Sequence, residues 1–276
     1  MKASSPLIYL DWNVVISLAD GGLPLFLDIL VTARKEHAII IPFSATHVQE
    51  ANNIADKPSA HHELVESRLQ FLSELSNNTY LYNAADVHSP ELRIEHPTTV
   101  RSTINEVSWA KPIMHDFVNM FGFDAMKQFR KELELEPKEL NNIKPPNVID
   151  QLDKIVEEKT KNKYPHSGSG FGVKRLLETS LKYYPDSKNL GLESRMAAVF
   201  SSLNFLGFWP DKEKRTNLVA AFNDALHAAT ASYCDYFVTE DRSLRVKTMA
   251  AYEFFEVATN VGHTSEAMSF IKQLRT

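Results

Sequence analysis

Residues 7–18 of the chain read Leu-Ile-Tyr-Leu-Asp-Trp-Asn-Val-Val-Ile-Ser-Leu. The four residues before Asp11 have the apolar character of a strand, and the apolar run after Asn13 is able to form a helix. In an α/β sheet, the side chains at the carboxyl end of a strand face the crevice in which ligands bind. The stretch therefore predicts that Asp11 lies at a binding edge.

The pattern that follows alternates between helix and strand. Apolar spacing and short β-branched or aromatic runs predict, in order, a helix at 24–35, a strand at 38–41, helices at 45–54 and 60–75, and a strand at 79–82. The alternation returns later with a helix at 216–233, strands at 235–239 and 255–258, and a closing helix at 265–274. This order is typical of an α/β fold built on a parallel sheet.

The middle of the chain has a different character, with prolines, mixed charge and long helical blocks. We therefore expect a core formed by residues 1–85 and 216–276, interrupted by a mostly helical insertion at 86–215. Within the insertion, a Gly/Ser-rich loop at 164–172 precedes Lys174 and Arg175. It lacks the Gly-Lys-Ser/Thr ending of a phosphate-binding P-loop, and either an ordinary loop or an RNA-contacting lid with Phe171 stacked on a base fits it.

Composition limits the function classes. The chain has 276 residues, 43% of them hydrophobic, which is enough for a sizeable core. Its single cysteine, Cys234, excludes an intrachain disulfide and a cysteine-based zinc cluster. The formal net charge of -5 argues against coating nucleic acid by charge alone. No apolar run or leader pattern indicates a membrane, so we expect a cytoplasmic protein.

Four carboxylates occupy comparable places in the predicted fold. Asp11 follows the first strand and Asp241 follows the strand at 235–239, while Glu50 and Asp224 lie on the helices at 45–54 and 216–233. Loops that follow parallel strands share one edge of the sheet, so these groups are able to converge. Clustered carboxylates repel one another unless a cation neutralises them, and oxygen ligands suit Mg²⁺ or Mn²⁺. The sequence thus predicts a hard-cation site.

These motifs resemble the PIN domain nucleases. The family has a strand followed by Asp-x-Asn, a Glu on the helix after the second strand, an Asp with a following His-Ala on a late helix, and Thr-x-Asp after the fourth strand. The matching residues here are Asp11 and Asn13, Glu50, Asp224 with His227 and Ala228, and Thr239 with Asp241. The resemblance covers about residues 6–82 and 216–276.

The resemblance implies a PIN-like sheet and a metal-dependent endoribonuclease that uses Mg²⁺ or Mn²⁺. It implies that Asp11, Glu50, Asp224 and Asp241 bind the metal, with Asn13 and Thr239 as polar supports. Lys174 and Arg175 are candidate contacts to the RNA substrate. An inhibitory or regulatory protein and a second copy of the chain in a homodimer are further partners that the family suggests, in a toxin, defence or RNA-processing setting.

Other interpretations remain open. Asp11 and Asp241 are also suited to cap helices, Glu50 to lie on a solvated helix face, and His227 to be a core histidine. A catalytically inactive module of the same fold that binds RNA or protein is the main alternative function. A phosphohydrolase of the haloacid dehalogenase type would require Asp rather than Asn at position 13.

Overall fold

The computed structural model describes residues 5–55, 62–82, 90–104, 123–165, 171–183, 191–210 and 217–275. The chain forms two compact units. The first consists of Met1–Ser108, Thr230–Arg242 and Ala258–Thr276, and the second of Trp109–Ala229 and Ser243–Val257. The first unit thus extends past residue 85 to residue 108, and most of the helix predicted at 216–233, together with residues 243–257, groups with the second unit.

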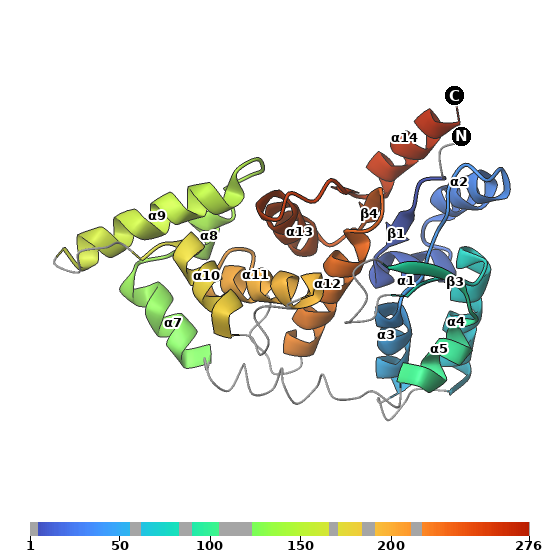
Figure 1. Ribbon diagram of the computed structural model, residues 1–276, viewed down its shortest axis with the longest axis horizontal. Coiled ribbons are helices and arrows are strands. Elements are labelled where there is room, and N and C mark those ends of the chain that lie inside the picture. The colour runs from blue at the N-terminus through green and yellow to red at the C-terminus, as the bar shows by residue number, and fades with distance from the viewer. Residues whose placement is uncertain are drawn as a thin grey trace. The chain divides into compact units, whose positions relative to one another are not determined.

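A three-stranded parallel sheet lies at the centre of the first unit (Figure 1). Its strands, in spatial order, are β1 (Ile8–Leu10), β4 (Tyr236–Val238) and β5 (Asn260–Gly262). Parallel pairing aligns Leu10 with Val238, and Val238 with Gly262. The predicted α/β class with a parallel sheet is therefore confirmed. The strand predicted at 255–258 is wrong in position, because α13 (Arg242–Phe254) and the turn after it precede β5.

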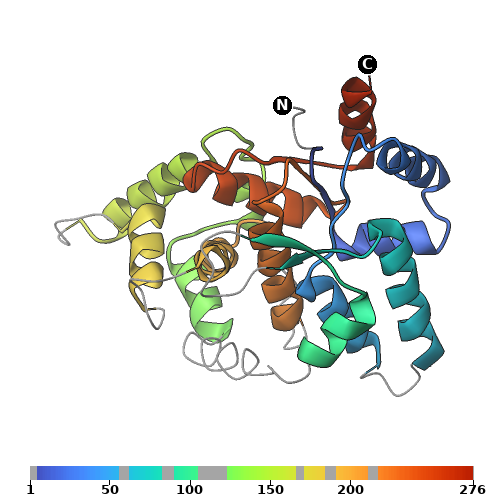
Figure 2. The same cartoon turned by 45° about the vertical axis from the view of Figure 1, so that its right-hand side comes forward.

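Pairing continues on the other side of β1 through two isolated parallel bridges. One joins Leu7 to Ile40, and the other joins Phe43 to Tyr80 in β2 (Thr79–Tyr82). The strand predicted at 38–41 is thus reduced to single bridges. The strand β2 also pairs antiparallel with β3 (Glu91–Ile94), a strand that the sequence did not predict (Figure 2).

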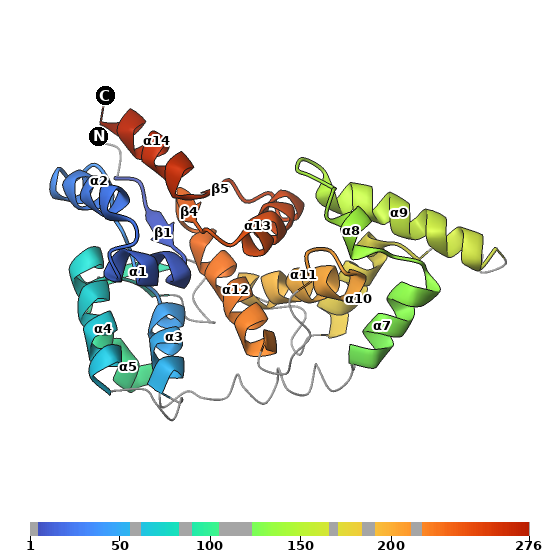
Figure 3. The same cartoon turned by 180° about the vertical axis from the view of Figure 1, so that it is seen from behind.

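Helices cover this sheet in the first unit. They are α1 (Trp12–Ala19), α2 (Pro24–Lys35), α3 (Ala45–Ala55), α4 (His62–Ser76), α5 (Pro97–Ile104) and α14 (Thr264–Leu274). The predicted helix at 24–35 is confirmed at both ends. α14 lies beside α2, as the view from behind also shows (Figure 3).

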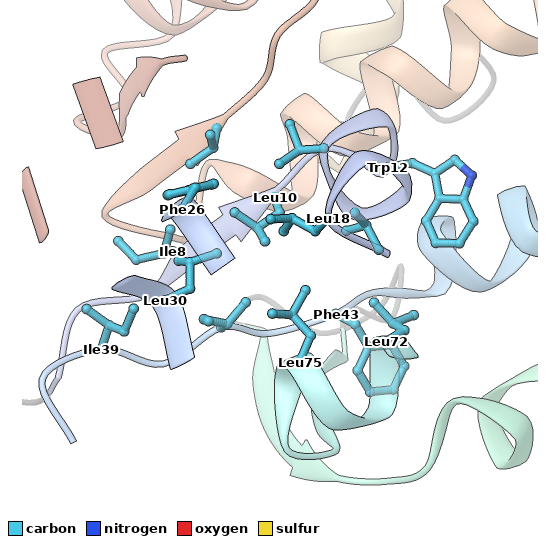
Figure 4. Packing of buried hydrophobic residues seen from close by; sticks show 14 of the residues in the cluster. Ile8, Leu10, Trp12, Leu18, Phe26, Leu30, Ile39, Phe43, Leu72 and Leu75 are labelled. Atoms are coloured by element: carbon cyan, nitrogen blue, oxygen red, sulfur yellow. The ribbon is translucent and has the colours of Figure 1, made fainter. Parts of the chain in front are cut away.

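The hydrophobic core of the first unit joins β1 to these helices. Ile8 and Leu10 lie in it together with side chains such as Leu30 of α2 and Leu72 of α4 (Figure 4). Since side chains alternate along a strand, the buried Tyr9 faces the opposite side of the sheet. Both faces of β1 are therefore buried up to Asp11.

The second unit is helical in its described residues. It contains α7 (Phe123–Glu132), α8 (Pro137–Leu140), α9 (Val148–Lys163), α10 (Val173–Tyr183), α11 (Leu192–Leu206), most of α12 (Asn217–Ala231) and α13. The ring of Phe129 contacts Phe171 and Phe205, with ring centroids 5.8 Å and 4.7 Å away. Phe171 therefore takes part in the packing of this unit. The centre of the loop predicted to be a lid, residues 166–170, lies outside the described residues.

Within the described ranges, no individual helix combines the length and apolar character needed to cross a bilayer. The helices α1 and α2 meet that criterion only when taken together, and the chain bends by 103° between them.

Candidate functional site

Asp11 stands where β1 changes into α1. Its backbone occupies the N-cap position, and its carbonyl oxygen accepts hydrogen bonds from the amides of Val14 and Val15. Its side chain, which is 2% exposed, makes no capping hydrogen bond. Instead, Oδ2 of Asp11 accepts a hydrogen bond from Oγ1 of Thr239, 3.0 Å away. The Asp11 carboxylate therefore does not act as an ordinary N-cap, because its hydrogen bond is made with Thr239 at the end of the neighbouring strand.

Thr239 connects two of the predicted carboxylate positions. It follows β4 directly and is fully buried, and its amide donates to the carbonyl oxygen of Gly262. Its Oγ1 donates to Asp11 and accepts a hydrogen bond from the backbone amide of Asp241, 3.1 Å away. One hydroxyl group thereby links the ends of β1 and β4. The parallel register brings these two ends together.

The two acidic residues after Thr239 differ in their surroundings. Glu240 is exposed, and its Oε1 accepts a hydrogen bond from the amide of Thr264 over 2.9 Å. This contact caps the first residue of α14, so Glu240 has a structural role there. Asp241 is also exposed and lies just before α13.

Glu50 lies on α3, where its side chain is half-buried. Its charge acts on the fully buried phenol of Tyr9. Burial raises the pKa of Tyr9 well above 10, the hydrogen bond with Ser44 lowers this pKa in part, and the charges of Cys234, Glu50 and Asp11 raise it further. Both carboxylates therefore lie within electrostatic range of this one hydroxyl group.

A buried polar network that the sequence did not predict lies under Asp11. The hydroxyl groups of Tyr9 and Ser44 are 2.6 Å apart. Nδ1 of His47 accepts from the amide of Ser44 over 3.0 Å, and its Nε2 lies 2.7 Å from the carbonyl oxygen of Leu10. The signal that could have indicated it is Pro42, which comes directly after the strand predicted at 38–41 and is followed by Ser44 and His47.

The remaining predicted site residues of the core have different positions. Asn13 is exposed on the first turn of α1. Asp224 is half-buried on α12 in the second unit, beside the buried Asn223 and His227. The grouping of Asp224 with the carboxylates of the first unit stays a prediction.

Lys174 and Arg175 lie in the second unit, on the first turn of α10. The Nζ atom of Lys174 is 2.8 Å from Oδ1 of Asp150 on α9. Its hydrogen bond to Asp150 raises the pKa of Lys174, and the same bond lowers the pKa of Asp150. The charge of Lys174 is therefore already balanced in part by a carboxylate.

The chemistry of the donors fits a hard divalent cation. Asp11, Glu50 and Asp241 offer carboxylate oxygens, the ligands that Mg²⁺ and Mn²⁺ prefer. Within the part of the chain that the structure describes, no three His, Cys, Asp or Glu side chains already form a metal-binding group. Carboxylates repel one another when no cation lies between them, so the carboxylate ligands need not lie close together before the cation binds.

Comparison with protein-family models, curated proteins and solved structures finds no match to this chain.

Proposed function

We propose that this protein is a metal-dependent endoribonuclease that hydrolyses RNA phosphodiester bonds and has a PIN-like fold. The observation that carries the proposal is the buried carboxylate of Asp11, which lies at the carboxyl end of β1 and is oriented by Thr239. Burying a carboxylate is costly unless a partner or a cation compensates for it. Such groups at a strand end are candidates for function.

The order of the parallel pairings supports the PIN-like assignment. Through the two isolated bridges, the order runs from β2 to residues 40–43 and on to β1, β4 and β5. Asp11 follows β1, Glu50 lies on the helix after residues 40–43, and Asp241 follows β4. In the proposal, these elements present their carboxylates at one edge of the sheet.

In this proposal, Asp11, Glu50 and Asp241 hold Mg²⁺ or Mn²⁺, and the role of Asp224 stays a prediction from the sequence. When bound, the cation supplies a Lewis acid that activates water and neutralises charge on the phosphodiester. The hydroxyl group of Thr239 keeps the Asp11 carboxylate in one direction. Lys174 and Arg175 contribute to RNA binding in the same proposal.

The proposal is tested by cleavage of a mixed, labelled RNA pool with Mn²⁺, with Mg²⁺ and with EDTA. We expect cleavage that depends on the metal and is lost in Asp11→Asn, Asp224→Asn and Asp241→Asn. Glu240→Gln is the matched control, because Glu240 is the exposed neighbour of Asp241 and caps α14. It should retain cleavage.

A folded native protein that neither cleaves RNA nor binds either metal in calorimetry would contradict the nuclease proposal. In that case the inactive module becomes the better interpretation, and RNA binding without cleavage would support it.

A further inference from the structure

The hydrogen bonds between β1 and the segment 40–44 begin as a regular parallel ladder. The amide of Ile8 donates to the carbonyl oxygen of Ile40 over 2.8 Å, and the amide of Ile40 donates to that of Pro6 over 2.9 Å. In this register, each further bond on the segment comes two residues later. The next donor would be residue 42, and the one after it residue 44.

Two bonds that the segment 40–44 would donate to this ladder are not made in the usual way. Residue 42 is proline, which has no amide hydrogen to donate to the carbonyl of Ile8. In register, the amide of Ser44 would then donate to the carbonyl of Leu10. The amide of Ser44 donates instead to Nδ1 of His47.

The imidazole of His47 stands between the two backbone groups that would otherwise pair. The Ser44 nitrogen lies 3.0 Å from Nδ1, and the Leu10 carbonyl oxygen lies 2.7 Å from Nε2. A backbone amide is only a donor and a carbonyl only an acceptor, so Nδ1 accepts and Nε2 carries the proton. The contacts therefore specify the neutral ring in its Nε2–H form.

This bond holds the peptide group that leads into Asp11. The carbonyl of Leu10 is bound by His47 on one side, and the amide of Asp11 donates to the carbonyl oxygen of Val238 over 2.9 Å on the other. The ring of His47 is 1% exposed and packs against Tyr9, with centroids 4.9 Å apart. Both ends of this peptide group are therefore fixed by buried partners.

We propose that His47 is a positioning residue for Asp11: its imidazole replaces the ladder bond between Ser44 and Leu10 and so sets the direction of the Asp11 carboxylate. The effect of His47 on metal binding and cleavage rests on the proposed function. Its effect on Asp11 does not.

The test compares two substitutions of the same buried residue. His47→Gln retains a donor and an acceptor in one planar group, whereas His47→Leu removes both. Thr259→Val is the control for the loss of a buried hydrogen bond, because Oγ1 of Thr259 donates to the carbonyl oxygens of Ser232 and Cys234, before β4 begins. Urea denaturation measures the stability of all three variants, so that only folded protein is compared.

The first measurement is nuclear magnetic resonance of the wild type and the variants. We expect nitrogen shifts of neutral His47 with the proton on Nε2. The amide and side-chain carboxyl resonances of Asp11 should move in His47→Leu and stay close to wild type in His47→Gln and Thr259→Val. A proton on Nδ1, or unchanged Asp11 resonances in His47→Leu, would overturn the positioning role even if one variant fails to fold.

The second measurement is Mn²⁺ affinity by calorimetry together with the kcat and KM of RNA cleavage. Loss of a partner that orients a metal ligand costs about 10–100-fold in affinity or activity. We expect that loss in His47→Leu, and for cleavage we expect it in kcat rather than in KM. His47→Gln should retain most of the Mn²⁺ affinity and of the cleavage activity. If the wild type neither binds Mn²⁺ nor cleaves RNA, the proposed function fails, and the Asp11 resonances alone decide the role of His47.

Discussion

Oγ1 of Thr239 donates a 3.0 Å hydrogen bond to Oδ2 of Asp11, although 228 residues separate the two positions in the chain. The bond exists because β1 and β4 are adjacent parallel strands whose ends are in register. It joins the two parts of the first unit that carry the Asp11 and Asp241 carboxylates.

Thr239→Val should weaken both stability and metal binding, because it leaves a buried carboxylate without this donor. We expect a loss of about 1–3 kcal/mol in the free energy of unfolding and about 10–100-fold in Mn²⁺ affinity. Urea denaturation and calorimetry measure the two effects. Thr239→Ser keeps the hydroxyl group and should retain most of the affinity, and equal affinities in the two variants would show that the hydroxyl has no such role.

Burial of Tyr9 should make stability depend on pH in the alkaline range. An unfolded tyrosine ionises near pH 10, whereas burial raises the pKa of Tyr9 well above that value. Above pH 10, the folded state therefore holds more protons than the unfolded state, and the free energy of unfolding falls as pH rises. Tyr9 contributes a slope of up to about 1.4 kcal/mol per pH unit to the fall in the free energy of unfolding. Below pH 10, its full contribution to the free energy of unfolding is present.

Tyr9→Phe should show a shallower loss of stability between pH 9 and pH 11 than the wild type, measured by urea denaturation at each pH. Tyr164→Phe provides the control, because this tyrosine is 44% exposed. It should follow the wild-type curve. Parallel curves for wild type and Tyr9→Phe would contradict the prediction.

Two leucines of α2 should respond very differently to truncation. Leu30 is fully buried in the core of the first unit, and Leu25 is 63% exposed. Leu30→Ala should cost about 2–5 kcal/mol of stability because it opens a cavity. Leu25→Ala should change stability by less than about 0.5 kcal/mol. Denaturation curves of the two variants test whether the core of the first unit is packed as described.

The pair formed by Lys174 and Asp150 should limit the contribution of Lys174 to RNA binding. Asp150→Asn removes the partner of the lysine, so we expect tighter binding of single-stranded RNA and a salt dependence steeper by about 0.7 in log affinity against log salt. Lys174→Gln should weaken binding. Lys161→Gln, a 62% exposed lysine of the same unit, is the control. Equal effects of the two lysine substitutions would argue against a specific contact at Lys174.

The elements that the sequence predicted well are those with a strong periodic pattern. The apolar spacing of residues 24–35 predicted α2 with its correct ends, and the apolar runs predicted β1 and β4. Periodicity succeeds here because each element buries one face or is covered on both. The strand β3 was missed because Glu91–Ile94 is largely exposed and is held mainly by pairing with β2.

The site was less predictable than the fold. The motif around Asp11 indicated the strand end, and the identity of Thr239 suggested a polar support, but the bond between them depends on strand register. His47 is a polar residue on the buried face of a helix, so the hydrophobic periodicity of the sequence does not single it out. Its role follows from the proline at position 42 and the register of residues 40–44, which only the three-dimensional arrangement shows.

The first unit is assembled from stretches at both ends of the sequence, and this has a consequence for synthesis. Ribosomes add about 5–20 residues per second, so the 228 residues that follow Asp11 up to and including Thr239 take roughly 10–45 s to make. During that time the nascent chain has β1 but not β4, and Asp11 has no hydroxyl partner from Thr239. On the proposed function, a chain released before residue 239 would be inactive, because it lacks both Thr239 and the carboxylate of Asp241.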